Sequence, residues 1–191
     1  GYIMYDNKIW VFDNIVDYEY QKLVADTLLS NKFPWFFLQD VTSSPNNPKT
    51  QKRSGFGHVY VDKPEKIVSP FHTTCLPIIE AACMKIGFKY EKIIQARSFL
   101  QLPLKGLSSE SSPDTTHVDL DYKHLVVLYY VIDSEGDTVI IREDEDNGEK
   151  FKIHKRVTPK MGRCVVFDGR FEHYAYQPDE NKRCIINYNL V

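Results

Sequence analysis

The sequence predicts an α+β fold in which a double-stranded β-helix, or jelly roll, is supported by N-terminal helices. Segments 17–31 and 69–88 have apolar residues at helical spacing, which predicts two helices in the first half of the chain. From about residue 90 the apolar period changes to two, the spacing of a half-buried strand. Short apolar segments separated by turn residues then follow to the C-terminus. Many short strands at regular spacing are typical of a sandwich, jelly roll or barrel.

Composition and length indicate an ordinary folded protein. A chain of 191 residues fits one domain, with 1–94 as the N-terminal support and 95–191 as the double-stranded β-helix core. Hydrophobic residues make up 42% and aromatic residues 13%, enough for a sizeable core. The net charge of −2, without a long basic run, gives no indication of a nucleic-acid partner.

Localisation is predicted from what the sequence lacks. No stretch approaches 18 apolar residues and the N-terminus has no apolar signal region, so we expect a cytoplasmic protein without a membrane partner. The four cysteines show no CxxC spacing. We expect them to be buried, reduced thiols rather than a zinc site.

The two predicted helices have recognisable beginnings. Asp17 is a candidate N-cap for 17–31, and Ser69 stands at the start of 69–88. Pro77 lies inside the second helix and should kink it. Flanking these helices we expect strands at 8–16 and 34–40.

The remaining segments of the chain divide into strands and loops. Segment 41–55 is polar and rich in proline, serine and asparagine; we expect a loop that serves as a mobile lid. Together with loop 103–114 it should determine substrate specificity. The charged segment 142–150 is expected to be a solvated hairpin tip. The predicted strands are 91–103, 115–119, 124–132, 138–142, 150–157, 163–167, 173–177 and 182–190.

A candidate metal site comes from three side chains. His117 and Asp119 are two residues apart, and residues i and i+2 of a strand share one face. His173 follows a turn and opens a later strand, so it can supply a third ligand. Two histidines and one carboxylate form the facial triad of non-haem Fe(II) oxygenases. A histidine two residues before an aspartate is common by chance, and a solvated turn pair is the alternative; the apolar strand that follows favours the metal site.

Arg183 is a candidate anion-binding residue. It begins an otherwise apolar strand, and counting by two places Ile185, Asn187 and Asn189 on its face. An arginine that points inward must find an anion, and a dicarboxylate could be bound through the guanidinium fork. The alternative is a surface arginine beside Asp179 or Glu180.

This pattern resembles the 2-oxoglutarate- and Fe(II)-dependent oxygenases, in particular the prolyl 4-hydroxylase-like branch. The N-terminal segments WVFDNIV and FPWFF are similar to those of compact members from phages and bacteria. The likeness to the superfamily itself is carried by HVD (117–119), LYYV (128–131), GDTVI (136–140), PKMGRCVVFDG (159–169), His173 and Arg183.

The resemblance implies a role for each matching residue. His117, Asp119 and His173 match the iron ligands, and Arg183 matches the residue that binds the far carboxylate of 2-oxoglutarate. Tyr130 matches a tyrosine whose hydroxyl assists that carboxylate. A further family tyrosine, on the strand before the HxD motif, is absent here; the nearest candidates are Gln101 and Phe99.

The implied reaction uses Fe(II), 2-oxoglutarate and O₂, with ascorbate as a candidate further cofactor. It would hydroxylate a peptidyl residue, with prolyl favoured, or a small molecule, and release succinate and CO₂. Nucleobase demethylation is disfavoured because no second arginine follows Arg183. Two other classes stay open: a non-catalytic cupin-like module that binds a metal or ligand, and a metal hydrolase or isomerase on the same barrel.

The other histidines and aromatic residues have simpler interpretations. Tyr129 is expected in the core and His124 at a strand end. Arg97 alternates with Phe99, so it either faces the pocket or pairs with a carboxylate at the core edge. Structural or exposed positions are expected for His58, His72 and His154.

Overall fold

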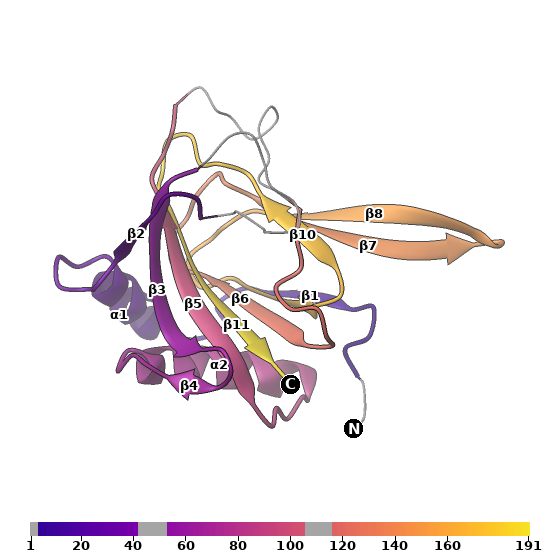
Figure 1. Cartoon of the computed structure of the whole chain (residues 1–191), viewed down its shortest axis with the longest axis horizontal. Coiled ribbons are helices and arrows are strands. Elements are labelled where there is room, and N and C mark those ends of the chain that lie inside the picture. The colour runs from indigo at the N-terminus through magenta and orange to yellow at the C-terminus, as the bar shows by residue number, and fades with distance from the viewer. Residues whose placement is uncertain (1–3, 42–52, 106–115) are drawn as a thin grey trace.

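In the computed structural model, which describes residues 4–41, 53–105 and 116–191, the chain folds into two antiparallel sheets and two helices (Figure 1). The larger sheet has the order β1 (Ile9–Phe12), β9 (Cys164–Asp168), β6 (Leu125–Tyr130), β11 (Arg183–Leu190), β5 (Ile93–Gln101), β3 (Gly55–Asp62) and β2 (Phe36–Leu38), with β4 (Lys66–Ile67) paired to β3. The smaller sheet has the order β10 (Glu172–Ala175), β7 (Thr138–Asp146) and β8 (Glu149–Val157). The described strands form these two sheets, as in a jelly roll, and do not join into a closed barrel.

Both predicted helices are present, each shorter than its predicted segment. Helix α1 (Tyr18–Leu28) begins after Asp17, whose carboxylate accepts a hydrogen bond from the backbone N–H of Tyr20 at 2.9 Å. Helix α2 (His72–Ile86) begins three residues after Ser69 and continues through Pro77. Neither helix has the length and apolar character needed to cross a membrane.

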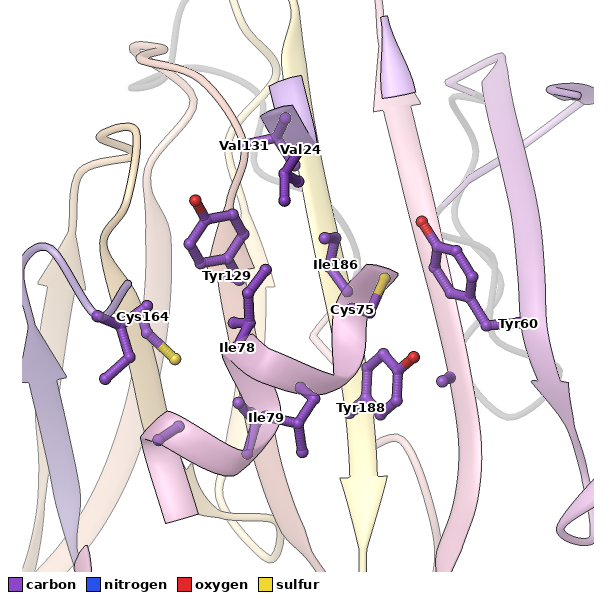
Figure 2. Packing of buried hydrophobic residues seen from close by; sticks show 14 of the residues in the cluster. Val24, Tyr60, Cys75, Ile78, Ile79, Tyr129, Val131, Cys164, Ile186 and Tyr188 are labelled. Atoms are coloured by element: carbon purple, nitrogen blue, oxygen red, sulfur yellow. The ribbon is translucent and has the colours of Figure 1, made fainter. Parts of the chain in front are cut away.

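The helices cover the outer face of the larger sheet and build the main core there (Figure 2). Ile78 and Ile79 of α2 are fully buried against the β6 and β11 side chains Tyr129, Ile186 and Tyr188. Fully burying one such aliphatic side chain contributes about 1.5–3 kcal/mol. The expected core position of Tyr129 is therefore confirmed, and this face of the sheet stabilises the fold.

The cysteines are buried free thiols, as predicted. Burial raises the pKa of Cys75 and Cys83 to about 12, and it raises the pKa of Cys164 and Cys184 as well. All four therefore stay protonated at neutral pH and behave as small apolar core residues.

The inner face of the larger sheet turns toward the smaller sheet and carries a second cluster of buried apolar residues. Tyr130 belongs to this inner cluster, while its neighbour Tyr129 belongs to the outer core. Successive side chains of a strand alternate between faces, so β6 contributes to both clusters. The inner cluster consists of Val126, Leu128, Tyr130, Ile140, Val157, Val165, Phe167, Phe171 and Ile185.

Segment 142–150 lies at the exposed end of a hairpin, as predicted, but most of it is strand rather than turn. Strands β7 and β8 continue through this segment and leave only Asn147 and Gly148 as the turn, both with positive φ (52° and 81°). Acidic residues of β7 stand opposite lysines of β8, for example Glu143 opposite Lys152, and such cross-strand pairs support an exposed ribbon. The far end of the β7–β8 hairpin projects from the rest of the molecule as a long arm (Figure 1).

Strand β3 was not predicted, because two glycines conceal its apolar alternation. A Cβ at Gly55 would lie 2.7 Å from the backbone oxygen of Leu100, and one at Gly57 would lie 2.8 Å from Leu38 Cδ1, so tertiary contacts require glycine at both positions. Gly55 thus begins a strand instead of ending a loop.

Three further predictions concern segments at the edge of the described chain. Residues 42–52 of the predicted lid and residues 106–114 of loop 103–114 lie outside the described residues. The predicted strand 115–119 is reduced, in its described part, to a single bridge at His117.

Candidate metal centre

The two histidines of the candidate centre are held opposite each other by their backbones. His117 N donates to His173 O at 3.0 Å, and His173 N donates to His117 O at 2.9 Å. The two residues of such an antiparallel pair project their side chains from the same face. Their rings lie 4.5 Å apart, centroid to centroid. A contact across 56 residues of sequence therefore brings together the two imidazoles that the sequence proposed.

Asp119 completes the cluster. Its Oδ1 lies 3.5 Å from His117 Nε2 and 3.3 Å from His173 Nε2, and its side chain is only 2% exposed. The ligand atoms of the three residues lie within 4.8 Å of one another. His173 is buried too, whereas the His117 side chain is 30% exposed, so the cluster is reached from solvent on the His117 side.

The electrostatics of the cluster favour an ionised carboxylate. Burial by itself would raise the pKa of Asp119, but the charges and hydrogen bonds of His173 and His117 outweigh it and hold the pKa well below its usual range. Metal ions bind the deprotonated carboxylate. Asp119 is therefore in its ligand form at neutral pH.

The residues fit a divalent metal of the iron type. Donor atoms about 2.0–2.2 Å from a metal lie roughly 3 Å apart when they occupy neighbouring positions, close to the Asp119–histidine separations found here. Two imidazoles and one carboxylate are the set associated with non-haem Fe(II), which keeps further positions open for other ligands.

Two asparagines that the sequence did not assign to the site orient the aspartate. Asp119 Oδ2 accepts hydrogen bonds from Asn187 Nδ2 at 3.1 Å and from Asn189 Nδ2 at 3.0 Å. Asn189 is itself fixed, because its Oδ1 accepts a hydrogen bond from Gln95 Nε2 at 2.6 Å. The signal available in the sequence was their alternation with Arg183 on β11, which places all three on one face.

Arg183 is buried, 4% exposed, at the start of β11. Its Nε donates to Gly136 O and its Nη2 donates to Thr138 Oγ1, both at 2.7 Å. A Cβ at Gly136 would lie 2.9 Å from Arg183 Cδ, so the close approach of this loop needs glycine. The alternative of a surface arginine is wrong, because the side chain points inward.

Tyr130 meets Arg183 through a shared threonine. The Tyr130 hydroxyl donates to Thr138 Oγ1 at 2.8 Å, and Arg183 Cζ lies 6.0 Å from the centroid of the tyrosine ring. Burial raises the pKa of Tyr130 to about 12, so the phenol keeps its proton at neutral pH. The pair therefore presents a cation and a phenol side by side.

Gln101 stands beside this pair. It is directly opposite Arg183 in the register of β5 and β11, so the two side chains share a face. It is buried, and its Nε2 donates to Gln177 Oε1 at 3.4 Å.

The other histidines lie outside the cluster. His124 is fully buried, and its Nδ1 is 2.7 Å from Tyr122 O. The two ring nitrogens of His58 contact Pro34 O and Ser69 Oγ, so His58 is structural, as expected. His72 contacts the Tyr188 hydroxyl at 2.8 Å, and His154 is exposed.

Comparisons with known proteins find likeness in structure. No protein-family model matches the sequence, and no curated protein is similar to it in sequence. An oxidoreductase of the 2OG-Fe(II) oxygenase family from Burkholderia pseudomallei superimposes with a TM-score of 0.64 at 14% identity, over 95% of this chain and 84% of that one. A prolyl-4-hydroxylase from Pseudomonas putida gives a TM-score of 0.60 at 11% identity, over 95% and 91%.

A prolyl hydroxylase from Trichoplax adhaerens, solved with a peptide of hypoxia inducible factor, gives a TM-score of 0.59 at 14% identity, over 96% and 83% of the two chains. The same fold occurs in an epimerase and a carbocyclase of nogalamycin biosynthesis, both dependent on α-ketoglutarate. These likenesses establish the fold. The predicted double-stranded β-helix with supporting helices is confirmed, and the structural neighbours belong to the superfamily that the sequence motifs indicated.

Proposed function

We propose that this protein is a 2-oxoglutarate- and Fe(II)-dependent dioxygenase. The observation that carries the proposal is the His117, Asp119 and His173 cluster, placed on the inner face of a 2OG-oxygenase fold with its carboxylate oriented by two buried amides. Two neighbours support it: one was solved with Fe³⁺ and α-ketoglutarate, and the other, a viral collagen prolyl hydroxylase, was solved with 2OG.

Separate residues of the chain bind the metal and the cosubstrate. Fe(II), when bound with 2-oxoglutarate and O₂, supplies the oxidative chemistry that yields succinate, CO₂ and a hydroxylated product. His117, Asp119 and His173 hold the metal. Arg183 binds the far carboxylate of 2-oxoglutarate through charge-assisted hydrogen bonds.

Tyr130 and Gln101 complete the cosubstrate site. Tyr130, protonated at neutral pH, can donate to the same carboxylate once its hydroxyl turns from Thr138, while Gln101 shares the face of Arg183. The buried surroundings of Arg183 exclude water and strengthen these contacts.

For the substrate we propose hydroxylation of a peptidyl residue, with prolyl favoured by the motif resemblance, or of a small molecule. Among the neighbours, three are prolyl hydroxylases, whereas others are an epimerase and a carbocyclase, so the same fold accommodates both substrate classes.

The test is succinate release from Fe(II)-loaded protein and 2-oxoglutarate, with and without ascorbate, against a panel of prolyl peptides, free amino acids and small acids. Asp119→Ala should abolish turnover while circular dichroism stays unchanged. Asp26→Ala, at an exposed position of α1, is the matched control and should retain turnover. Tight metal binding without 2-oxoglutarate turnover would instead favour a binding module or a metal hydrolase.

A further inference from the structure

A second pocket lies on the same sheet as the candidate metal centre. It has a volume of about 690 Å³ and is formed by β2, β3, β5 and the segment that leads into α2. Its walls are mainly apolar, with Phe36, Leu38, Val59, Phe71 and Phe99 among the lining residues. Pockets of this size and character suit small organic molecules.

The strand register connects this pocket to the metal centre. Arg97 and Phe99 of β5 line the pocket and stand directly opposite Asn187 and Ile185 of β11. Directly opposite residues of an antiparallel pair point to the same face. Asn187 also donates to Asp119, so β11, the neighbour of β5, connects this side of the pocket to the carboxylate of the centre.

Arg97 brings a positive charge into the pocket, and no described residue provides a counter-ion for it. Its Nε is buried and has no hydrogen-bond partner, and within the described chain its guanidinium forms no ion pair. Its Cζ lies 5.2 Å from the centroid of the Phe99 ring. An unpaired charge in a partly buried position is unfavourable, and an anionic ligand bound here would offset that cost. The described residues therefore do not show the alternative arrangement, in which Arg97 pairs with a carboxylate at the core edge.

Asn187, directly opposite Arg97 on β11, supplies a second unsatisfied atom. Its Nδ2 must face Asp119 because a carboxylate only accepts hydrogen bonds, which turns its Oδ1 away from the aspartate. That Oδ1 is buried and has no partner. An unpaired donor on Arg97 and an unpaired acceptor on Asn187 thus stand opposite each other, between the metal centre and the pocket.

The other polar residues of the pocket neither bind an anion in place of Arg97 nor pair with Arg97. Both ring nitrogens of His58 are occupied, and burial lowers its pKa, so it is neutral at pH 7. Asp40 lies toward the other end, where its Oδ1 accepts from Arg53 N. Arg97 lies opposite Val59 of β3, and Val59 is six residues after Arg53. Six residues of extended chain span roughly 20 Å, so Asp40 lies far from Arg97.

We propose that this pocket binds the substrate, and that the substrate is a carboxylic acid with an apolar body. Arg97 binds the carboxylate, the apolar walls take the body, and Asn187 Oδ1 accepts from a neighbouring amino or hydroxyl group. The same chemistry is offered by a free acid, such as an apolar amino acid, and by the C-terminal carboxylate of a peptide. The inference deepens the proposed function, on which it rests for the assignment of the pocket to the substrate.

The experiment measures binding to the metal-loaded protein under anaerobic conditions, by NMR or calorimetry, and so does not depend on turnover. The probes are 3-phenylpropionate, L-leucine, L-phenylalanine and a Gly-Phe dipeptide, each compared with its carboxamide. We expect saturable binding of at least one acid, with the carboxamide about 10- to 100-fold weaker. Binding of the free acids alone, or of the dipeptide as well, identifies the source of the carboxylate.

Variants assign the effect to Arg97. Arg97→Gln should weaken binding of the acid to the level of the carboxamide, and Arg97→Lys should restore part of it, because lysine keeps the charge but loses the fork. Arg142→Gln, on the hairpin arm, is the matched control and should bind like the wild type.

Two outcomes overturn the inference: no saturable binding of any acid at millimolar concentration, or equal binding by wild type and Arg97→Gln. A parallel titration with 2-oxoglutarate separates this result from the proposed function. If 2-oxoglutarate binds and the acids do not, the inference fails alone. If the acids bind through Arg97 and 2-oxoglutarate does not, the proposed function fails while the pocket assignment as an acid site stands.

Discussion

Replacing Asn189 by alanine should weaken metal binding although Asn189 is not a metal ligand. The substitution removes one of the two amide donors to Asp119 Oδ2, the bond at 3.0 Å, and leaves the bond from Asn187 at 3.1 Å. A hydrogen bond to a charged group is worth about 1.5–3 kcal/mol. Loss of one outer partner of a metal ligand typically costs about 10- to 100-fold in metal affinity, or roughly 1.4–2.7 kcal/mol, so both estimates agree.

The same substitution also breaks the buried bond between Gln95 and Asn189, and a matched variant separates the two effects. Gln95→Ala loses the 2.6 Å bond to Asn189 but keeps both donors to Asp119. The two variants should lose similar thermal stability, whereas Asn189→Ala alone should show the large fall in affinity. The assay is competition for Co²⁺ or Fe²⁺ against a chromophoric chelator without O₂. Equal metal affinities for the two variants would refute the argument that this amide orients the carboxylate.

Three other predictions follow from buried groups. Arg183→Ala should weaken 2-oxoglutarate binding about 30- to several-thousand-fold, from the roughly 2–5 kcal/mol lost when one partner of a buried charge pair is truncated, and Arg183→Lys should retain part of it. The check is an anaerobic titration of 2-oxoglutarate into Fe(II)-loaded protein, followed by the metal-to-ligand charge-transfer absorbance. If Arg183→Ala binds 2-oxoglutarate as tightly as the wild type, Arg183 is not part of the cosubstrate site. Burial alone would raise the pKa of Asp168, but hydrogen bonds from Arg170 and backbone N–H groups lower it overall. Because the pKa of Asp168 is lower in the folded state, its ionised carboxylate stabilises the fold at pH values above the unfolded pKa of about 3.9, and this stabilisation is lost as the pH falls below that value. The free energy of unfolding of Asp168→Asn should therefore fall less steeply than that of the wild type as the pH is lowered. Gly169→Ala should destabilise by about 1–3 kcal/mol in denaturant unfolding, because the new Cβ would lie 2.2 Å from His124 Nε2; wild-type stability would show that the buried imidazole can move.

Sequence alone determined the class of fold and the three candidate metal ligands. Both depend on local patterns: helical spacing over α1 and α2, a period of two from β5 onward, and a histidine two residues before an aspartate. The N-cap at Asp17 and the inward arginine at Arg183 were predictable for the same reason. Most of these signals lie within one segment of the chain, where residue spacing translates directly into a shared face, whereas His173 reaches the other two ligands through a contact across 56 residues.

Only the tertiary structure decided how these elements serve the site. The amides of Asn187 and Asn189 reach Asp119 across 68 and 70 residues, and Arg97 stands opposite Asn187 through a register that no local pattern encodes. Strand β3 could not be predicted from the sequence because its glycines are required by close contacts with atoms of neighbouring strands. The hairpin arm, likewise, depends on acidic and basic residues that pair across strands. The physical reason is common to all of them: side-chain partners in a sheet are set by strand order and register, and these are fixed by packing against the rest of the molecule.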